Sequence, residues 1–206
     1  MYALATRRPI PGLPDWPIFK DDIELTLAAL NEIKPKAIFI PYWSWKIPPD
    51  IIANYECVGF HCTDLPFGRG GSPIENLIAR GFDHTKLSVF RMDDKFDAGP
   101  IYLKRDLSLA GDMNAILNRI DRLIAEIIFG MIENWPTPQP QTGEVVIFKR
   151  KTPAERAAIM AVHKVVELTL ASHHTDPQSD RQPYANPGQA TASPVVYQRD
   201  WPNLEV

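Results

Sequence analysis

The chain has 206 residues, of which 45% are hydrophobic and 23% are charged, a composition typical of a globular protein that buries its own core. The 22 Lys and Arg residues are outnumbered by 25 Asp and Glu, and a net charge of −3 gives no global attraction to nucleic acid. No apolar run approaches the roughly 18 residues of a membrane span, and no apolar signal core follows Arg7 and Arg8. We therefore predict a cytoplasmic protein that contacts neither membrane nor nucleic acid.

Proline content divides the chain, because 20 prolines are about twice the average share and gather toward the two ends and in loops. We predict four parts, which are a proline-rich leader, a catalytic domain, a C-terminal helix and a low-complexity tail that does not pack, over residues 1–20, 21–150, 151–170 and 171–206.

Helix-like and strand-like patterns alternate through the central part of the chain. Apolar residues three or four apart, or a Ser/Thr-Pro start, predict helices over 21–33, 72–80, 112–134 and 152–170, with a short one from Pro48. Short apolar or alternating runs predict strands over 37–40, 57–61, 87–92, 101–107 and 143–149. This order predicts an α/β fold with a mostly parallel central sheet flanked by helices.

Two polar residues stand where such sheets build their sites. His61 ends the buried strand 57–61, and Asp97 lies in the turn after the next main strand, so in a parallel sheet both share one edge. Each alone has an ordinary explanation, as a hydrogen-bonded strand end or a turn former. Together they predict a general acid/base pair, since a carboxylate can hold a histidine in one tautomer.

Other groups around this pair have two readings. Arg69, next to Gly70 in a glycine-rich loop, either binds a phosphate at the start of the following helix or is a surface arginine. Tyr42, Trp43 and Trp45 follow the strand 37–40 and either stack on a base or sugar or belong to the core.

The remaining reactive residue types indicate no further site. Cys57 and Cys62 are interpreted as small buried hydrophobes, and residues 149–151 as a solvated basic strand end. Apart from His173 and His174, the histidines do not stand at ligand spacing, so we predict no metal.

Two separated motifs resemble formyltransferases that use 10-formyltetrahydrofolate, over about residues 22–150. The segment from His61 to Pro73 is similar to that family's strand-end histidine, Leu-Pro, glycine-arginine loop and Ser/Ala-Pro, and the segment from Phe96 to Gly99 is similar to its aspartate turn. The segments 43–48 and 61–66 resemble the branch that acts on amino sugars, of the pseudaminic-acid pathway type, more than the methionyl-tRNA enzymes.

The resemblance implies a Rossmann-like formyltransferase fold and an N-formyltransferase that moves a formyl group from the cosubstrate 10-formyltetrahydrofolate to the amine of a nucleotide-linked amino sugar, without a metal. It implies that His61 is the general acid/base and Asp97 its partner. The implied cofactor-binding residues are Leu65, Pro66, Arg91, Met92, Asp93 and Asp94. The implied substrate-binding residues are Tyr42, Trp43, Trp45, Arg69 and Gly70. A second copy of the chain could be a partner in a homodimer.

Position 59 departs from the family pattern. The family carries an asparagine two residues before the histidine, whose amide donates to the developing oxyanion, and here the residue is Gly59. Ser44, Thr63 or a backbone N–H could replace that donor. One alternative within the family is a methionyl-tRNA formyltransferase-like protein. Because of Gly59, the other alternative is a relative that binds folate or a sugar nucleotide without turnover. Because the family normally starts with a strand and helix before residue 22, we also expect a missing sheet edge.

Overall fold

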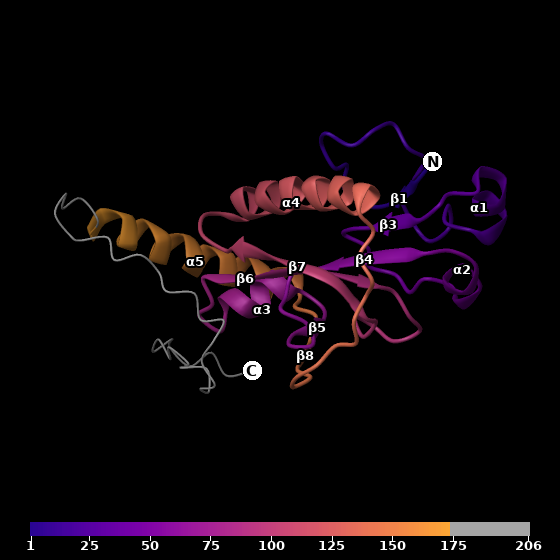
Figure 1. Cartoon of the computed structure of the whole chain (residues 1–206). Coiled ribbons are helices and arrows are strands. Elements are labelled where there is room, and N and C mark those ends of the chain that lie inside the picture. The colour runs from indigo at the N-terminus through magenta and orange to yellow at the C-terminus, as the bar shows by residue number, and fades with distance from the viewer. Residues whose placement is uncertain (174–206) are drawn as a thin grey trace.

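A computed structural model gives the structure of the chain, and it describes residues 1–173. Its main sheet has six strands in the order β2-β1-β3-β4-β6-β7 (Figure 1). These strands are β1 (Ala3–Ala5), β2 (Ile18–Phe19), β3 (Ile38–Ile40), β4 (Cys57–His61), β6 (His84–Arg91) and β7 (Ile101–Ser108). The pairings from β2 to β4 are parallel and those of β6 with β4 and β7 are antiparallel. The predicted α/β fold with a mostly parallel sheet is thus confirmed.

Five helices complete the described part of the chain. They are α1 (Leu27–Ile33), α2 (Pro49–Asn54), α3 (Pro73–Ile78), α4 (Met113–Glu133) and α5 (Pro153–His173). Figure 1 shows α4 lying along one side of the sheet, and α3 and α5 contact each other near β6. The predicted apolar stripe of α4 is buried, because it faces the sheet while its polar side faces water. No helix of residues 1–173 combines the length and the hydropathy needed to span a bilayer.

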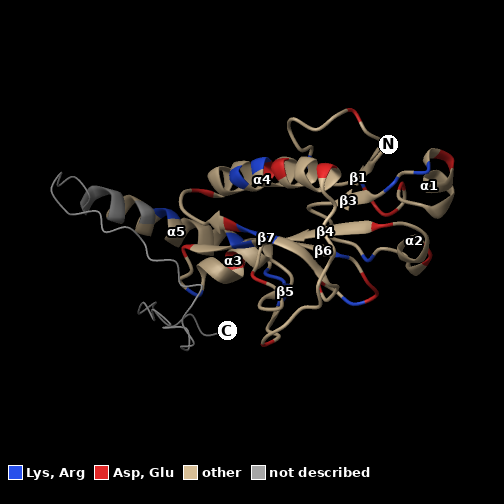
Figure 2. Ribbon diagram, viewed as in Figure 1, with Lys and Arg blue, Asp and Glu red and all other residues tan. Residues whose placement is uncertain are grey.

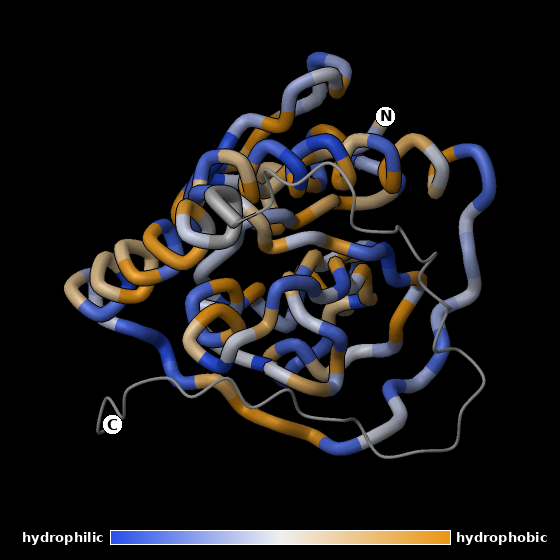
Figure 3. The backbone as a smooth tube through the Cα atoms, turned by 90° about the vertical axis from the view of Figure 1, so that its left-hand side faces the viewer, coloured by the Kyte–Doolittle hydropathy of each residue, from blue (hydrophilic) through white to orange (hydrophobic). Residues whose placement is uncertain are grey.

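The sheet is covered on both faces, as the continuous apolar strands predict. Successive side chains of a strand alternate between faces, so Ile38 and Ile40 join one apolar cluster while Phe39 joins the other. Leu30 of α1 and Ile51 of α2 close the first cluster, and α4 closes the second. Figure 3 shows that the connection from α4 to the next strand is mostly hydrophilic and runs round the outside of the molecule.

The N-terminal segment belongs to the sheet, which corrects the prediction of a separate leader over residues 1–20. β1 lies between β2 and β3, with Leu4 opposite both Ile18 and Phe39, and its three residues are buried. The predicted missing edge is therefore present. Strands of three and two residues between prolines are too short to show a periodic pattern, which is why the sequence did not indicate them.

The C-terminal part holds a second, smaller sheet. β8 (Ile147–Phe148) falls within the strand predicted over 143–149, but it pairs with β5 (Arg69–Gly70) and not with the main sheet. α5 begins at the predicted Thr-Pro start with a capping box, in which Thr152 and Glu155 each accept the other's backbone N–H. The predicted tail over 171–206 lies outside the described residues from position 174 onward.

His61 and Asp97 were predicted to share a sheet edge because their strands are parallel, and the direction of β6 shows that this reason is wrong. β6 is antiparallel to β4, with Val58 opposite Arg91 and His61 opposite Ser88, so β6 ends where β4 begins. The chain after β6 has to double back to bring Asp97 to His61. It does so in a loop whose two ends meet at Gly99, where an added Cβ would lie 1.8 Å from the Arg91 carbonyl oxygen.

Gly99→Ala should therefore destabilise the protein by roughly 1–3 kcal/mol or more, because neither backbone segment can move away freely. The matched control is Gly130→Ala in α4, where an added Cβ meets nothing within 4 Å. That change should stabilise the helix by about 0.5–1 kcal/mol. Urea unfolding of both variants measures the difference, and equal effects of the two changes would contradict the close approach at Gly99.

Candidate active site

A cavity of about 710 Å³ opens at the edge where β3 and β4 end. The loop after β3, the end of β4 and the β5–α3 loop form its walls, together with the loop that carries Asp97 and the start of α5. Of the residues predicted to form the site, those that line this cavity are Tyr42, Trp43, Trp45, His61, Gly70, Met92 and Asp97.

His61 is buried in this cavity wall and both of its ring nitrogens face polar groups. Its Nε2 lies 2.8 Å from the Gly68 carbonyl oxygen, which can only accept, so Nε2 carries the proton. Its Nδ1 lies 3.6 Å from Asp97 Oδ1. The free lone pair of the neutral ring is therefore on Nδ1, and a proton taken up there faces a carboxylate.

Two neighbouring groups, on Gly70 and Gln141, hold Asp97. The Gly70 N–H donates to Asp97 Oδ2 over 2.8 Å, and Gln141 Nε2 donates to the carbonyl oxygens of Asp97 and Gly99 over 2.8 Å each. The backbone of Asp97 is left-handed, with φ at 51°, a region that Asp adopts more readily than most residues. The carboxylate is thus fixed beside His61 by its own loop and by the β5 segment.

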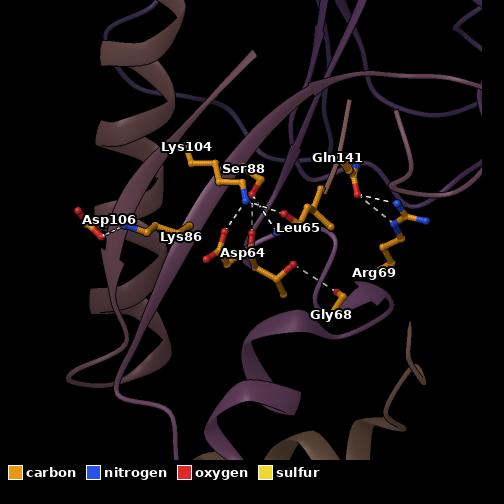
Figure 4. Close-up of polar contacts among 10 residues, drawn as sticks. Asp64, Leu65, Gly68, Arg69, Lys86, Ser88, Lys104, Asp106 and Gln141 are labelled. Carbon is orange, nitrogen blue, oxygen red and sulfur yellow. Dashed lines mark hydrogen bonds and ion pairs between the residues drawn. The ribbon is translucent and has the colours of Figure 1, made fainter. Parts of the chain in front are cut away.

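Arg69 braces the site from outside the cavity. Its Nε and Nη2 donate to Gln141 Oε1 over 3.1 and 2.7 Å, which Figure 4 shows as a paired contact between the two side chains. The same Gln141 holds the loop of Asp97. The structure therefore places this guanidinium on the loop that positions the carboxylate, and not in the cavity wall where a substrate phosphate was predicted.

The predicted cofactor residues are mostly apart from this cavity. Leu65 is buried, its N–H donates to Ser88 Oγ and its carbonyl accepts from Lys104 (Figure 4), and neither it nor Pro66 lines the cavity. Arg91 forms an ion pair with Glu56 over 2.7 Å at a second, smaller cavity of about 330 Å³, and Met92 lines both cavities.

The acidic pair Asp93 and Asp94 also lies outside the lining of both cavities. Asp93 accepts the N–H of Lys95 within its own turn. A role of these residues in cofactor binding stays a prediction.

The aromatic loop after β3 is anchored to α4 through a buried carboxylate. Asp121 accepts the Tyr42 hydroxyl over 2.7 Å and the Arg8 guanidinium over 2.8 Å. Burial, followed by this bond to Asp121, raises the pKa of Tyr42, so the phenol stays a donor at every ordinary pH. The anchor joins three segments that are far apart in the sequence.

Charged residues near the beginnings of α3 and α5 also line the cavity, and the sequence did not indicate them as site residues. Glu75, Arg150, Lys151 and Arg156 line the cavity, and Arg156 Nε lies 2.5 Å from the buried Glu75 carboxylate. The run 149–151 was predicted to be a solvated strand end, yet Arg150 and Lys151 reach the cavity. Elsewhere in the view of Figure 2, charges of both signs are interspersed over helices and loops.

The two thiols are shielded. Burial raises the pKa of Cys57 and that of Cys62 to about 12 each, although Cys62 lines the cavity and is less buried than predicted. Among residues 1–173, no three His, Cys, Asp or Glu side chains gather in a way that could hold a metal ion.

Comparisons with known proteins bear on this site. No family model matches the sequence. The methionyl-tRNA formyltransferase of Rickettsia typhi is 28% identical over 138 residues, which are 65% of this chain and 45% of that enzyme. A solved methionyl-tRNA formyltransferase from Clostridium thermocellum is 38% identical with a TM-score of 0.70, and the match covers 75% of this chain and 74% of that one.

A more distant structure shares the fold. PseJ from Anoxybacillus kamchatkensis, solved in complex with UDP-4,6-dideoxy-4-formamido-L-AltNAc and tetrahydrofolate, is 16% identical with a TM-score of 0.59 over 72% of this chain and 85% of that one. The fold is of the Rossmann-like α/β class, with an imidazole and a carboxylate at a strand edge. By its similarity to the Clostridium enzyme, the chain belongs to the formyltransferase family. It spans about half the length of the curated relatives it matches.

Asp121→Ala should lower the free energy of unfolding by about 1–3 kcal/mol, because it leaves the buried Tyr42 hydroxyl without its acceptor and frees Arg8. The matched control is Glu126→Ala on the exposed side of the same helix, which should change stability by less than about 0.5 kcal/mol. Urea unfolding measures both. A loss of the same size in the two variants would show that Asp121 is no anchor.

Both thiols should resist iodoacetamide in the native protein. A pKa raised from 9.0 to about 12 lowers the thiolate fraction at pH 8 about a thousandfold. The rate should rise about tenfold per pH unit until pH 12, since only the thiolate reacts. Mass spectrometry of timed samples measures this, with urea-unfolded protein as the fast control, and rapid native labelling at pH 8 would contradict the shielding.

Proposed function

We propose that the chain transfers a formyl group from 10-formyltetrahydrofolate to the primary amine of an acceptor. The observation that carries this proposal is the His61–Asp97 pair, 3.6 Å apart in a 710 Å³ cavity with the other imidazole nitrogen occupied by a backbone carbonyl. The arrangement suits a general acid/base whose protonated form is stabilised by a neighbouring carboxylate. Membership of the formyltransferase family supports the same reaction.

The reaction needs one proton carrier and no redox step. The acceptor nitrogen attacks the formyl carbon, so a new C–N bond forms and the carbonyl electron pair moves onto oxygen. His61 Nδ1 takes the proton from the attacking amine, and Asp97 stabilises the resulting imidazolium. When the C=O bond re-forms, the bond between the formyl carbon and folate N10 breaks, and N10 receives the proton. The products are the formamide and tetrahydrofolate.

For the acceptor, the relatives favour an aminoacyl-tRNA over the nucleotide-linked amino sugar that the sequence predicted, because curated relatives of the chain are methionyl-tRNA formyltransferases. The exclusion of nucleic acid rested on the net charge of the whole chain. Arg150 and Lys151 at the cavity supply positive charge that can approach a phosphate backbone, while Arg156 is paired with Glu75.

A nucleotide-linked amino sugar is the second candidate. PseJ is a fold neighbour whose structure holds such a UDP-sugar and tetrahydrofolate. The ring faces of Tyr42, Trp43 and Trp45 in the cavity wall can stack on a base or sugar. The two acceptors share a primary amine and a phosphate, so both suit the same catalytic pair.

His61→Ala should lower turnover by about 10²- to 10⁴-fold, the range that a positioned acid/base contributes, and Asp97→Asn should lower it in the same direction. The assay follows tetrahydrofolate released from 10-formyltetrahydrofolate, with methionyl-tRNA in one series and a UDP-linked 4-amino sugar in the other. The matched control is His84→Ala, which removes a histidine from an exposed His–Asp pair and should leave turnover unchanged.

The two assay series also identify the acceptor and test whether the protein binds folate without turnover. Turnover with only one acceptor assigns the substrate class. Tetrahydrofolate binding with no turnover for either acceptor would support the non-catalytic alternative and overturn the proposed activity.

A further inference from the structure

The position of the family asparagine is filled by an aromatic ring. An added Cβ at Gly59 would lie 2.6 Å from Phe90 Cζ, 2.8 Å from Phe90 Cε1 and 3.1 Å from Met92 Cγ. Gly59 and Phe90 are opposite each other in the pairing of β4 with β6, so the ring comes from the neighbouring strand. No side chain at position 59 can deliver a hydrogen bond to a ligand while Phe90 stays in place.

Two of the replacements considered for this donor are already engaged. Thr63 is fully buried, its hydroxyl donates to the Gly68 carbonyl oxygen over 3.4 Å, and it does not line the cavity. The Gly70 N–H donates to Asp97 Oδ2. Ser44 lines the cavity but is exposed to water, where a hydroxyl gives weaker electrostatic stabilisation.

Trp43 offers a buried donor that nothing in the described part of the chain accepts. Among residues 1–173, its Nε1 is the buried side-chain nitrogen or oxygen that has no hydrogen-bond partner. Such atoms are rare, and the indole N–H is a donor only, so an acceptor from outside the chain can satisfy it once a small shift of the side chain exposes the N–H. Trp43 lines the same cavity as His61 and Asp97.

The strand topology places Trp43 near Gly59, the position at which the family carries its asparagine. β3 and β4 are parallel, with Ile40 opposite Gly59, and both run toward the cavity edge. Trp43 follows Ile40 by three residues, and His61 follows Gly59 by two. Trp43 and Met92 also pack against the same apolar cluster, and Met92 contacts the Cβ position of Gly59.

We propose that the Trp43 indole N–H donates to the formyl oxygen of bound 10-formyltetrahydrofolate, in place of the family asparagine. The bond strengthens as that oxygen becomes an oxyanion during attack by the amine, because a hydrogen bond to a charged acceptor is stronger than one to a neutral carbonyl. The indole keeps its proton throughout, and His61 remains the proton carrier. This assignment rests on the proposed function and makes Trp43 a catalytic residue.

Trp43→Phe keeps the aromatic body and removes the N–H. We expect kcat to fall about 10²- to 10³-fold, the loss that follows removal of one oxyanion donor, while the Kd for tetrahydrofolate stays within about twofold. Trp135→Phe is the matched control, because Trp135 lies outside the cavity lining and is 37% exposed, so the same change there should keep most of the turnover. Full turnover by Trp43→Phe, or a loss that appears instead in Ser44→Ala, overturns the assignment.

A second measurement does not depend on turnover. In the ¹⁵N-labelled full chain, the Trp43 indole proton is assigned by its absence from the Trp43→Phe spectrum. It should move downfield on addition of 10-formyltetrahydrofolate and not with tetrahydrofolate, since only the former carries the acceptor oxygen. An indole proton that responds equally to both folates overturns the proposal. Wild-type protein that shows the specific shift without turnover would contradict the proposed activity alone.

Discussion

The site depends on the return of the chain after β6. Because β6 runs antiparallel to β4, its end lies at the sheet edge away from His61, and the nine residues 92–100 have to carry Asp97 back. The close contact of Gly99 with the Arg91 carbonyl permits the reversal, and Gln141 fixes it by donating to two carbonyls of the loop. Without this return, the cavity would contain an imidazole with no carboxylate beside it.

The glycine-rich loop holds both members of the pair through its backbone. The Gly68 carbonyl accepts from His61 and the Gly70 N–H donates to Asp97, so one short segment sets the tautomer of the first and the position of the second. β8 holds that segment in turn, and an added Cβ at Gly70 would lie 2.5 Å from the Phe148 carbonyl oxygen. The loop that the sequence indicated as a phosphate site is thereby a support for His61 and Asp97, and Arg69 extends that support to Gln141.

Patterns with a strong local signal could be predicted from the sequence, and arrangements set by distant contacts could not. The stripe of α4, the strand ending at His61 and the capping box before α5 each show their own period or residue signature. The direction of β6 has no such signature, because a strand looks the same in either direction along its residues. For the same reason, the position of Arg150 and Lys151 at the cavity follows from the pairing of β8 with β5, which joins segments almost 80 residues apart.

The ring of Phe90 fills the space beside Gly59, so the absence of the asparagine side chain at position 59 has to be considered together with Phe90. A ring on β6 and a missing side chain on β4 complete one packed unit beside the cavity, and an asparagine at position 59 would need a smaller residue at position 90. The pair of His61 with Asp97 is untouched by this exchange, since its contacts come from Gly68 and Gly70 and from the loop 92–100. The exchange therefore moves the demand for a hydrogen-bond donor from β4 to the neighbouring β3 loop, where Trp43 Nε1 is buried and has no hydrogen-bond partner among residues 1–173.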